Sequence, residues 1–288
     1  MSSILVSSNV QNIAENVAKK VTQNLEYNYI GRSFLETIAN EFNTTVDRLK
    51  KTLNWLKSSK TVSNKSIDLN LAYIQQAVLE KLLNDNVVCE GLAAHFYIKG
   101  ISHILNVRVI SESKKNKNRH ENNKNHYYKN FIRMIDPIKI FRTNSNYQFS
   151  GIDENDVSMY DIVLDIEKIG IDNVINTIVL MAKDRKFKPM NYSRKMLIDL
   201  TLASKFRVLL LSRFSNFRVL ADGDTVIVHI KCSKRQKVNI AGEIKAIANR
   251  IPEIKFVEVH AVSKLPIPNE NIEKKKKTNK ICNYSGGC

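Results

Sequence analysis

The chain has 288 residues, of which 43% are hydrophobic, so it can bury the core of one large or two small domains. That hydrophobic content excludes a chain that is disordered throughout. The 45 Lys and Arg residues outnumber the 28 Asp and Glu residues, and the net charge is +17. The four cysteines have no CxxC spacing, which argues against a zinc ribbon and a disulfide scaffold. Without a secretory leader or a long apolar run, a cytoplasmic protein with no spanning helix is expected.

The positive charge is unevenly distributed. Residues 112–142 have a net charge of +6, and residues 181–268 have a net charge of +11. Such clusters are usually solvated faces, but they also suit polyanions such as nucleic acid or acidic lipid. No zinc-finger spacing and no aromatic-interleaved RNA-binding signature is present, so nucleic acid is the less favoured partner.

The first third of the chain is predicted to contain two short strands and several helices. Residues 3–7 are apolar and β-branched, which predicts a buried strand. Asn9 or Asn12 is expected to cap the following helix, which extends to Leu25. A short strand is predicted at 27–30, and helices are predicted at 34–42 and 68–84. Between these two helices, Thr44 or Thr45 is expected to cap a further helix.

The next segments alternate between strands and helices. Residues 86–90 predict a buried strand that ends in Glu90 and Gly91. A helix over 92–99, strands over 104–110 and 158–165, and a helix over 174–181 capped by Asp172 follow. Apolar strands that alternate with helices predict a parallel sheet covered on both faces, and the basic segment 112–150 interrupts it.

The last third has a different pattern. Residues 183–192 read as a linker, and a long helix over 193–214 follows. Asp222-Gly223-Asp224 separates two apolar strands, which is a hairpin signal. A helix over 238–250 and a strand over 255–262 complete an αββαβ unit, and the tail at 266–288 is expected to be disordered.

Several segments, taken in order, resemble the cytidylate kinase-like family of P-loop nucleotide kinases. The resemblance covers residues 3–182, and its clearest segments are 87–95, 99–103, 107–110 and 151–165. It implies an α/β domain over 1–182, with a P-loop-kinase-like parallel sheet and a lid-like basic insertion at 112–150.

A second resemblance concerns the αββαβ unit, assigned to residues 193–265. Its segments 221–223 and 247–252 resemble those of a BON domain, a small α+β module. The resemblance implies association with a membrane or a ligand, so acidic lipid or a protein is a candidate partner.

The kinase resemblance implies transfer of a phosphoryl group from ATP to a nucleoside monophosphate, with CMP as one candidate and Mg²⁺ as cofactor. The lid arginines of this family stabilise the transferring phosphate, and here they would be Arg119, Arg133 and Arg142. Arg32, which follows a predicted strand, would clamp the monophosphate. Glu90 and Gly91, at the carboxyl edge of the sheet, would hold a sugar hydroxyl or Mg²⁺.

The chain departs from this family where the phosphate-binding loop is expected. Kinases of this type need G-x-x-x-x-G-K-[ST] after the first strand, but this chain has Ser8-Asn9-Val10-Gln11-Asn12. Ser8, Asn9 and Asn12 are therefore the residues expected to face nucleotide. Residues other than glycine rarely adopt a positive φ, so wrapping around phosphates is disfavoured, and the missing lysine removes transition-state stabilisation.

Each of these residues can also have an ordinary structural role. Arg32 can be an exposed residue at a helix start, Glu90 can cap the next helix, and the six histidines and four cysteines give no metal-site spacing. Three functions are therefore considered. The first is a cytidylate kinase-like enzyme with impaired catalysis. The second is a non-catalytic pseudo-kinase that acts as a nucleotide sensor or scaffold and whose basic BON-like unit binds acidic lipid or a protein, and the third is a nucleic-acid-binding protein.

Overall fold

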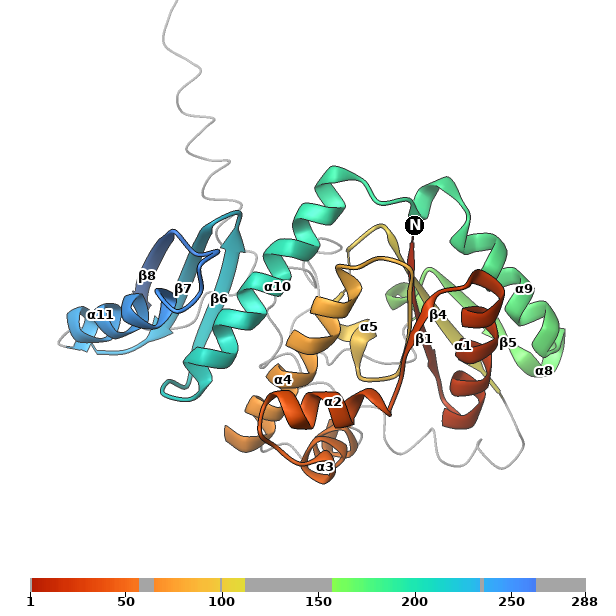
Figure 1. Ribbon diagram of the computed structural model, residues 1–288, viewed down its shortest axis with the longest axis horizontal. Coiled ribbons are helices and arrows are strands. Elements are labelled where there is room, and N and C mark those ends of the chain that lie inside the picture. Colours follow the sequence, from red (N-terminus) through yellow and green to blue (C-terminus); the bar gives the residue numbers. More distant parts are fainter. Residues whose placement is uncertain (1, 57–64, 99, 112–156, 234–235, 263–288) are drawn as a thin grey trace, which may run out of the picture.

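The computed structural model describes residues 2–56, 65–98, 100–111, 157–233 and 236–262. These residues form two sheets, and a long helix lies between them (Figure 1). No helix in the described ranges has both the length and the apolar character needed to cross a membrane.

The larger sheet has five parallel strands in the order β2-β3-β1-β4-β5. Their bounds are β1 (Ser3–Ser8), β2 (Asn28–Ile30), β3 (Val87–Glu90), β4 (Ile104–Ile110) and β5 (Ile162–Asp165). β1 lies in the centre, and its Val6 is opposite both Glu90 and Val107. The predicted parallel α/β sheet is therefore confirmed.

Helices cover both faces of this sheet, as the apolar strands require. Two helices, α1 (Gln11–Leu25) and α9 (Ile171–Ala182), pack on one face through a cluster that includes Ile4 and Val6. The other face has a cluster that includes Leu5. Its helices are α2 (Phe34–Glu41), α3 (Val46–Leu56), α4 (Lys65–Leu82) and α5 (Ala94–Tyr97). Two single-turn elements, the 3-10 helix η2 (Val157–Met159) and α8 (Ile166–Ile169), flank β5.

Two of the predicted helix caps were wrong. The N-cap of α1 is Val10, in an extended conformation and with no side-chain cap, because the Asn9 side chain bonds elsewhere. The N-cap of α9 is Gly170, so Asp172 lies in the first turn of the helix. The predicted Thr45 cap is confirmed, since the Arg48 N–H donates to the Thr45 hydroxyl at 3.4 Å.

The smaller sheet has three strands in the order β6-β7-β8. Its elements are α10 (Asn191–Leu211), β6 (Phe217–Asp222), β7 (Thr225–Lys231), α11 (Lys237–Ala248) and β8 (Phe256–Val262). β6 and β7 are antiparallel, whereas β7 and β8 are parallel. The predicted αββαβ order is confirmed, and the likeness to a BON domain stays a prediction.

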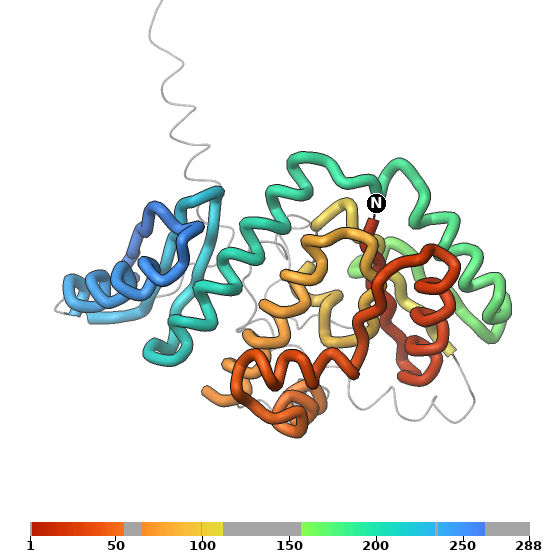
Figure 2. The backbone as a smooth tube through the Cα atoms, viewed as in Figure 1, coloured from red at the N-terminus to blue at the C-terminus, as the bar shows by residue number. Residues whose placement is uncertain are grey.

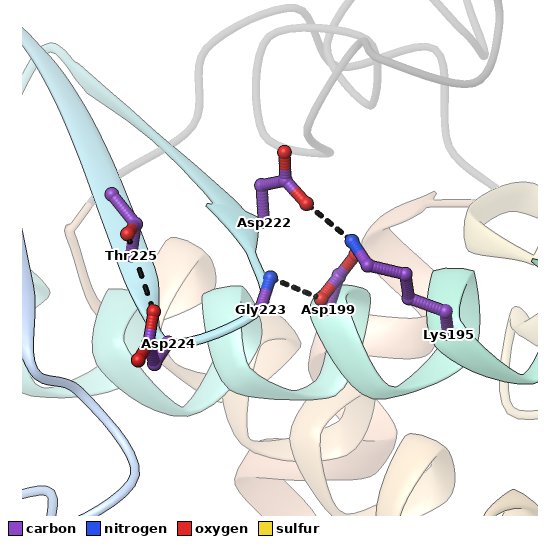
Figure 3. Close-up of polar contacts among 6 residues, drawn as sticks. All are labelled: Lys195, Asp199, Asp222, Gly223, Asp224 and Thr225. Atoms are coloured by element: carbon purple, nitrogen blue, oxygen red, sulfur yellow. Dashed lines mark hydrogen bonds and ion pairs between the residues drawn. The ribbon is translucent and has the colours of Figure 1, made fainter.

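The β6–β7 turn is tied to α10 by polar contacts (Figure 3). Asp199 on α10 accepts a hydrogen bond from the Gly223 N–H at 2.9 Å, and Lys195 forms ion pairs with Asp199 and Asp222. Gly223 has φ +63°, which a residue with a Cβ rarely adopts, so the sequence Asp-Gly-Asp suits this tight turn.

The helix α10 belongs to both hydrophobic cores. Near its start, Leu197 packs in the cluster that includes α4, and Arg194 forms an ion pair with Asp85 at 3.6 Å. Further along, Phe206 and Leu210 are completely buried against the three-stranded sheet. Figure 2 shows α10 running between α4 and β6. The predicted linker contains a 3-10 helix, η3 (Arg185–Phe187), and the proposed domain limits stay predictions.

Candidate functional site

A pocket opens at the carboxyl ends of β1 and β3, where open parallel sheets bind their ligands. Its walls come from β1, the start of α1, the turn before α2, the end of α3 and the segment that joins β3 to α5. Four of the predicted nucleotide-binding residues line it, namely Ser8, Arg32, Glu90 and Gly91. Whether they bind a nucleotide stays a prediction.

The remaining predicted residues are placed differently. Asn9 and Asn12 do not line this pocket, and Asn12 is exposed on α1. Arg119, Arg133 and Arg142, the predicted catalytic arginines, lie outside the described residues, as do the whole 112–150 insertion and the 266–288 tail.

The connection between β1 and α1 consists of only Asn9 and Val10. The Asn9 side-chain amide donates to the Ser111 carbonyl at 2.9 Å, and its oxygen accepts from the Ser111 N–H at 3.1 Å. The Ser8 hydroxyl accepts from the Val10 N–H at 3.1 Å. Ser111 is in turn held by Glu167, whose carboxylate accepts a hydrogen bond from the Ser111 hydroxyl at 2.5 Å. This connection is therefore fixed against the end of β4 by its own side chains.

Glu90 is the last residue of β3 and is only 4% exposed. It is close enough to Tyr29 to affect that phenol: burial is the main cause of the raised Tyr29 pKa, and the Glu90 charge adds to it. The suggested role of Glu90 as a helix cap was wrong, because the N-cap of α5 is Ala93, which makes no side-chain cap bond.

The segment after Glu90 has unusual backbone geometry. Gly91, Leu92 and Ala93 have φ values of 68°, 52° and 58°. Only glycine adopts this conformation freely, so Leu92 and Ala93 are strained by about 1–2 kcal/mol each. Leu92 is held in place because it is buried in the core, and the Gly91 N–H donates to the Val6 carbonyl at 3.2 Å. The strain lies at the pocket wall, where functional sites often concentrate it.

Arg32 supplies positive charge at the pocket. It is exposed in the turn between β2 and α2, and its carbonyl accepts from the Leu35 N–H at 3.1 Å. Arg32 also contributes to the lowered pKa of Glu15, after the larger effect of the Lys19 hydrogen bond. Arg32 and Glu90 thus place a cation and a buried carboxylate on the lining of one pocket.

Sequence reasoning assigned no role to a buried aromatic and cationic cluster beside this pocket. Arg108 on β4 is 3% exposed, and its guanidinium lies 5.8 Å from the centre of the Tyr160 ring. The Tyr160 ring centre is 6.0 Å from that of His95, which lines the pocket. An arginine inside a mostly apolar strand is a sequence signal that a buried cation needs a partner, although it does not say which residue that partner is.

The described residues between β1 and α1 supply neither a glycine nor a lysine to the phosphates of a Mg²⁺–ATP complex. Glu90 is the carboxylate in the pocket, and the neighbouring Ser7 and Ser8 hydroxyls donate to the Val107 carbonyl and the Asn9 side chain. No group of three or more His, Cys, Asp or Glu in the described part of the chain is arranged to hold a metal ion.

Comparison of the sequence with known protein families identifies one match. The sequence profile of the cytidylate kinase-like family matches residues 4–168, which are 165 of the 288 residues. No curated protein is significantly similar in sequence. Among solved structures, an uncharacterised protein from Eubacterium ventriosum is 14% identical, with a TM-score of 0.38, over 64% of this chain and 100% of its own. That likeness is too low to support an argument.

Proposed function

Since the chain belongs to the cytidylate kinase-like family, we propose that its pocket binds a nucleoside monophosphate and that its transfer of phosphate from ATP is strongly impaired. Arg32 would pair with the monophosphate, and Glu90 would accept hydrogen bonds from the sugar hydroxyls. CMP is the first candidate among the nucleotides.

The observation that carries the proposal is the closed β1–α1 connection. A phosphate-binding loop uses several free backbone N–H groups and a lysine, and here the two connecting residues are neither glycine nor lysine. The Asn9 clamp on Ser111 also fixes this connection against β4. Rebuilding it around a triphosphate would break both hydrogen bonds.

Electrostatic stabilisation is the main source of catalysis in phosphoryl transfer. Losing one such group typically costs about 3–4 kcal/mol, which slows the reaction by about 100- to 1,000-fold. ATP and Mg²⁺ would still be needed for any transfer that remains. The chain is thus proposed to act as a binding protein for monophosphates more than as a transferase.

Calorimetric titration tests the binding half of this proposal. The protein should bind CMP or another nucleoside monophosphate, and R32Q should weaken binding at least about tenfold, because a charged pair to phosphate is lost. The matched control is R48Q, since Arg48 is exposed on α3 and does not line the pocket. If R32Q and R48Q bind equally well, or if no monophosphate binds, the assignment is wrong.

A coupled assay with Mg·ATP and each monophosphate tests the catalytic half. We expect neither turnover nor micromolar ATP binding. Turnover at rates normal for kinases, about 1–100 per second, would contradict the proposed impairment. Binding of acidic lipid or protein by the C-terminal unit, and binding of nucleic acid, remain predictions, because no described contact favours one of them.

A further inference from the structure

The three-stranded sheet ends in an edge strand that has little of the usual protection. β8 lies at the end of the molecule away from the five-stranded sheet (Figure 1), and no described strand pairs with its outer edge. Edge strands are commonly protected by charged side chains, above all lysine, by proline or by a bulge, and the acidic residue of β8 is Glu258. The sequence of β8, Phe-Val-Glu-Val-His-Ala-Val, has neither proline nor lysine, and all seven residues pair in regular register with β7.

We propose that β8 pairs antiparallel with β8 of a second copy of this chain, about a two-fold axis at Val259. In this register Phe256 lies opposite Val262 of the second copy, and Glu258 lies opposite its His260. The strand extends from Phe256 to Val262, so Val259 is its middle residue and all seven residues take part. The two edges then form one six-stranded sheet, and each copy uses the same surface.

Side-chain chemistry supports this register. Phe256, Glu258, His260 and Val262 share the outer face of the sheet, since Val257 and Val259 pack toward the core. Phe256 is 61% exposed, and pairing would cover it with an aliphatic side chain. Glu258 and His260 already pair within one chain at 3.3 Å, and in this register each would also face its counterpart in the second copy. When His260 is protonated, these cross-strand contacts join opposite charges, which are favourable, whereas like charges are not.

The charges along the outer face give a second reason. Arg218, His229 and His260 lie side by side across β6, β7 and β8, so three basic groups form one row. The neighbouring row is Leu220, Ile227 and Glu258, which ends in an acid at the same edge. In the antiparallel dimer about Val259, Glu258 at the end of one row lies beside His260 at the end of the other row in the second copy. This contact forms twice in each dimer.

An interface of one strand pair is small, so the dimer is expected to dissociate on dilution. Sedimentation velocity near pH 6.5 should show mass rising from 33.0 kDa toward twice that value at concentrations of about 10–100 μM. E258K and H260E should each raise the dissociation constant at least about tenfold, because each places two like-charged pairs in the dimer. E243K, a matched change on α11, should leave dimerisation unchanged.

Mixing the two variants excludes loss of folding as the explanation. In an E258K–H260E heterodimer, the introduced lysine faces the introduced glutamate, and the native His260 faces the native Glu258. The equimolar mixture should therefore dimerise like the unchanged protein. A monomer at every concentration, single variants that dimerise normally, or a mixture that stays monomeric would each overturn the proposal.

Discussion

The two sheets differ in how much of each is covered. Both faces of the five-stranded sheet are covered by helices, and polar residues that include Ser8 and Glu90 line the pocket where β1 and β3 end. The three-stranded sheet is covered by α10 and α11 on one face, and its outer face carries Arg218, His229, His260 and Glu258.

This difference indicates where each region can bind. A sheet covered on both faces leaves only its ends for ligands, so a small molecule enters among the loops. A sheet that no described helix covers on one face, and whose edge no described strand pairs with, offers a larger, flatter surface, which suits another polypeptide. The same chain thus has a concave site and a strand edge on separate sheets.

The largest expected effect comes from truncating one buried phenylalanine in each region. Phe187 is 1% exposed in the core of the five-stranded sheet, and Phe206 is 0% exposed in that of the three-stranded sheet. F187A and F206A should each cost about 3–5 kcal/mol of unfolding free energy. Hydrogen exchange should show lost protection mainly in β1, β4 and α9 for F187A, and in β6, β7 and β8 for F206A. Equal loss in both sheets for either variant would mean that they unfold as one unit.

A smaller effect is expected at the β1–α1 connection. N9A removes the partners of the Ser111 N–H and carbonyl, and Ser111 is buried, so the variant should lose about 1–3 kcal/mol of stability. Denaturant unfolding measures this loss. Monophosphate binding at the pocket should persist, in contrast to R32Q. If N9A abolishes binding while the fold is intact, Asn9 contacts the ligand as the sequence suggested.

The smallest effect concerns pH and the open face of the three-stranded sheet. Partial burial lowers the His229 pKa, and the neighbouring His260 and Arg218 charges lower it further. The folded state thus binds fewer protons than the unfolded state. The stability that depends on a neutral His229 is therefore present above about pH 6.5 and is lost as the pH falls below that value. The loss should be a few tenths of a kcal/mol, because the group is partly solvated. Unfolding of H229Q between pH 7 and 5 should show a shallower slope than the unchanged protein, and an identical slope would contradict this cause.

Much of the fold could be predicted from the sequence, because burial patterns repeat along the chain. The apolar runs at Ile4–Val6 and Val87–Cys89 predict strands buried on both faces, and both strands are interior in the sheet. Asp222-Gly223-Asp224 predicts the hairpin because the turn needs glycine at a positive φ. The caps were less predictable: Asn9 is a good cap by type, but its distant partner Ser111, 102 residues away, decided its role.

The candidate site was predictable only where residues follow a strand end. Ser8, Glu90 and Gly91 follow or end strands, so their convergence at one sheet edge comes from topology. The strain at Leu92 and Ala93 could not be read from the sequence, since both residue types favour ordinary helical or extended backbone. Nor could the position of Arg108 beside Tyr160, because it depends on how β4 and β5 pair.

The shared helix α10 has a consequence for how the chain can be divided. Leu197 completes the core beside α4, whereas Phe206 and Leu210 complete that of the three-stranded sheet, so the border between the two cores runs through one helix. During synthesis, the N-terminal region cannot cover α4 until the first turns of α10 have left the ribosome. A gene fragment that stops before residue 191 would leave the apolar surface of α4 exposed. One that begins after residue 211 would lack the helix that packs against the three-stranded sheet. Recombination between relatives of this chain would therefore preserve both regions only when α10 is inherited with each of them.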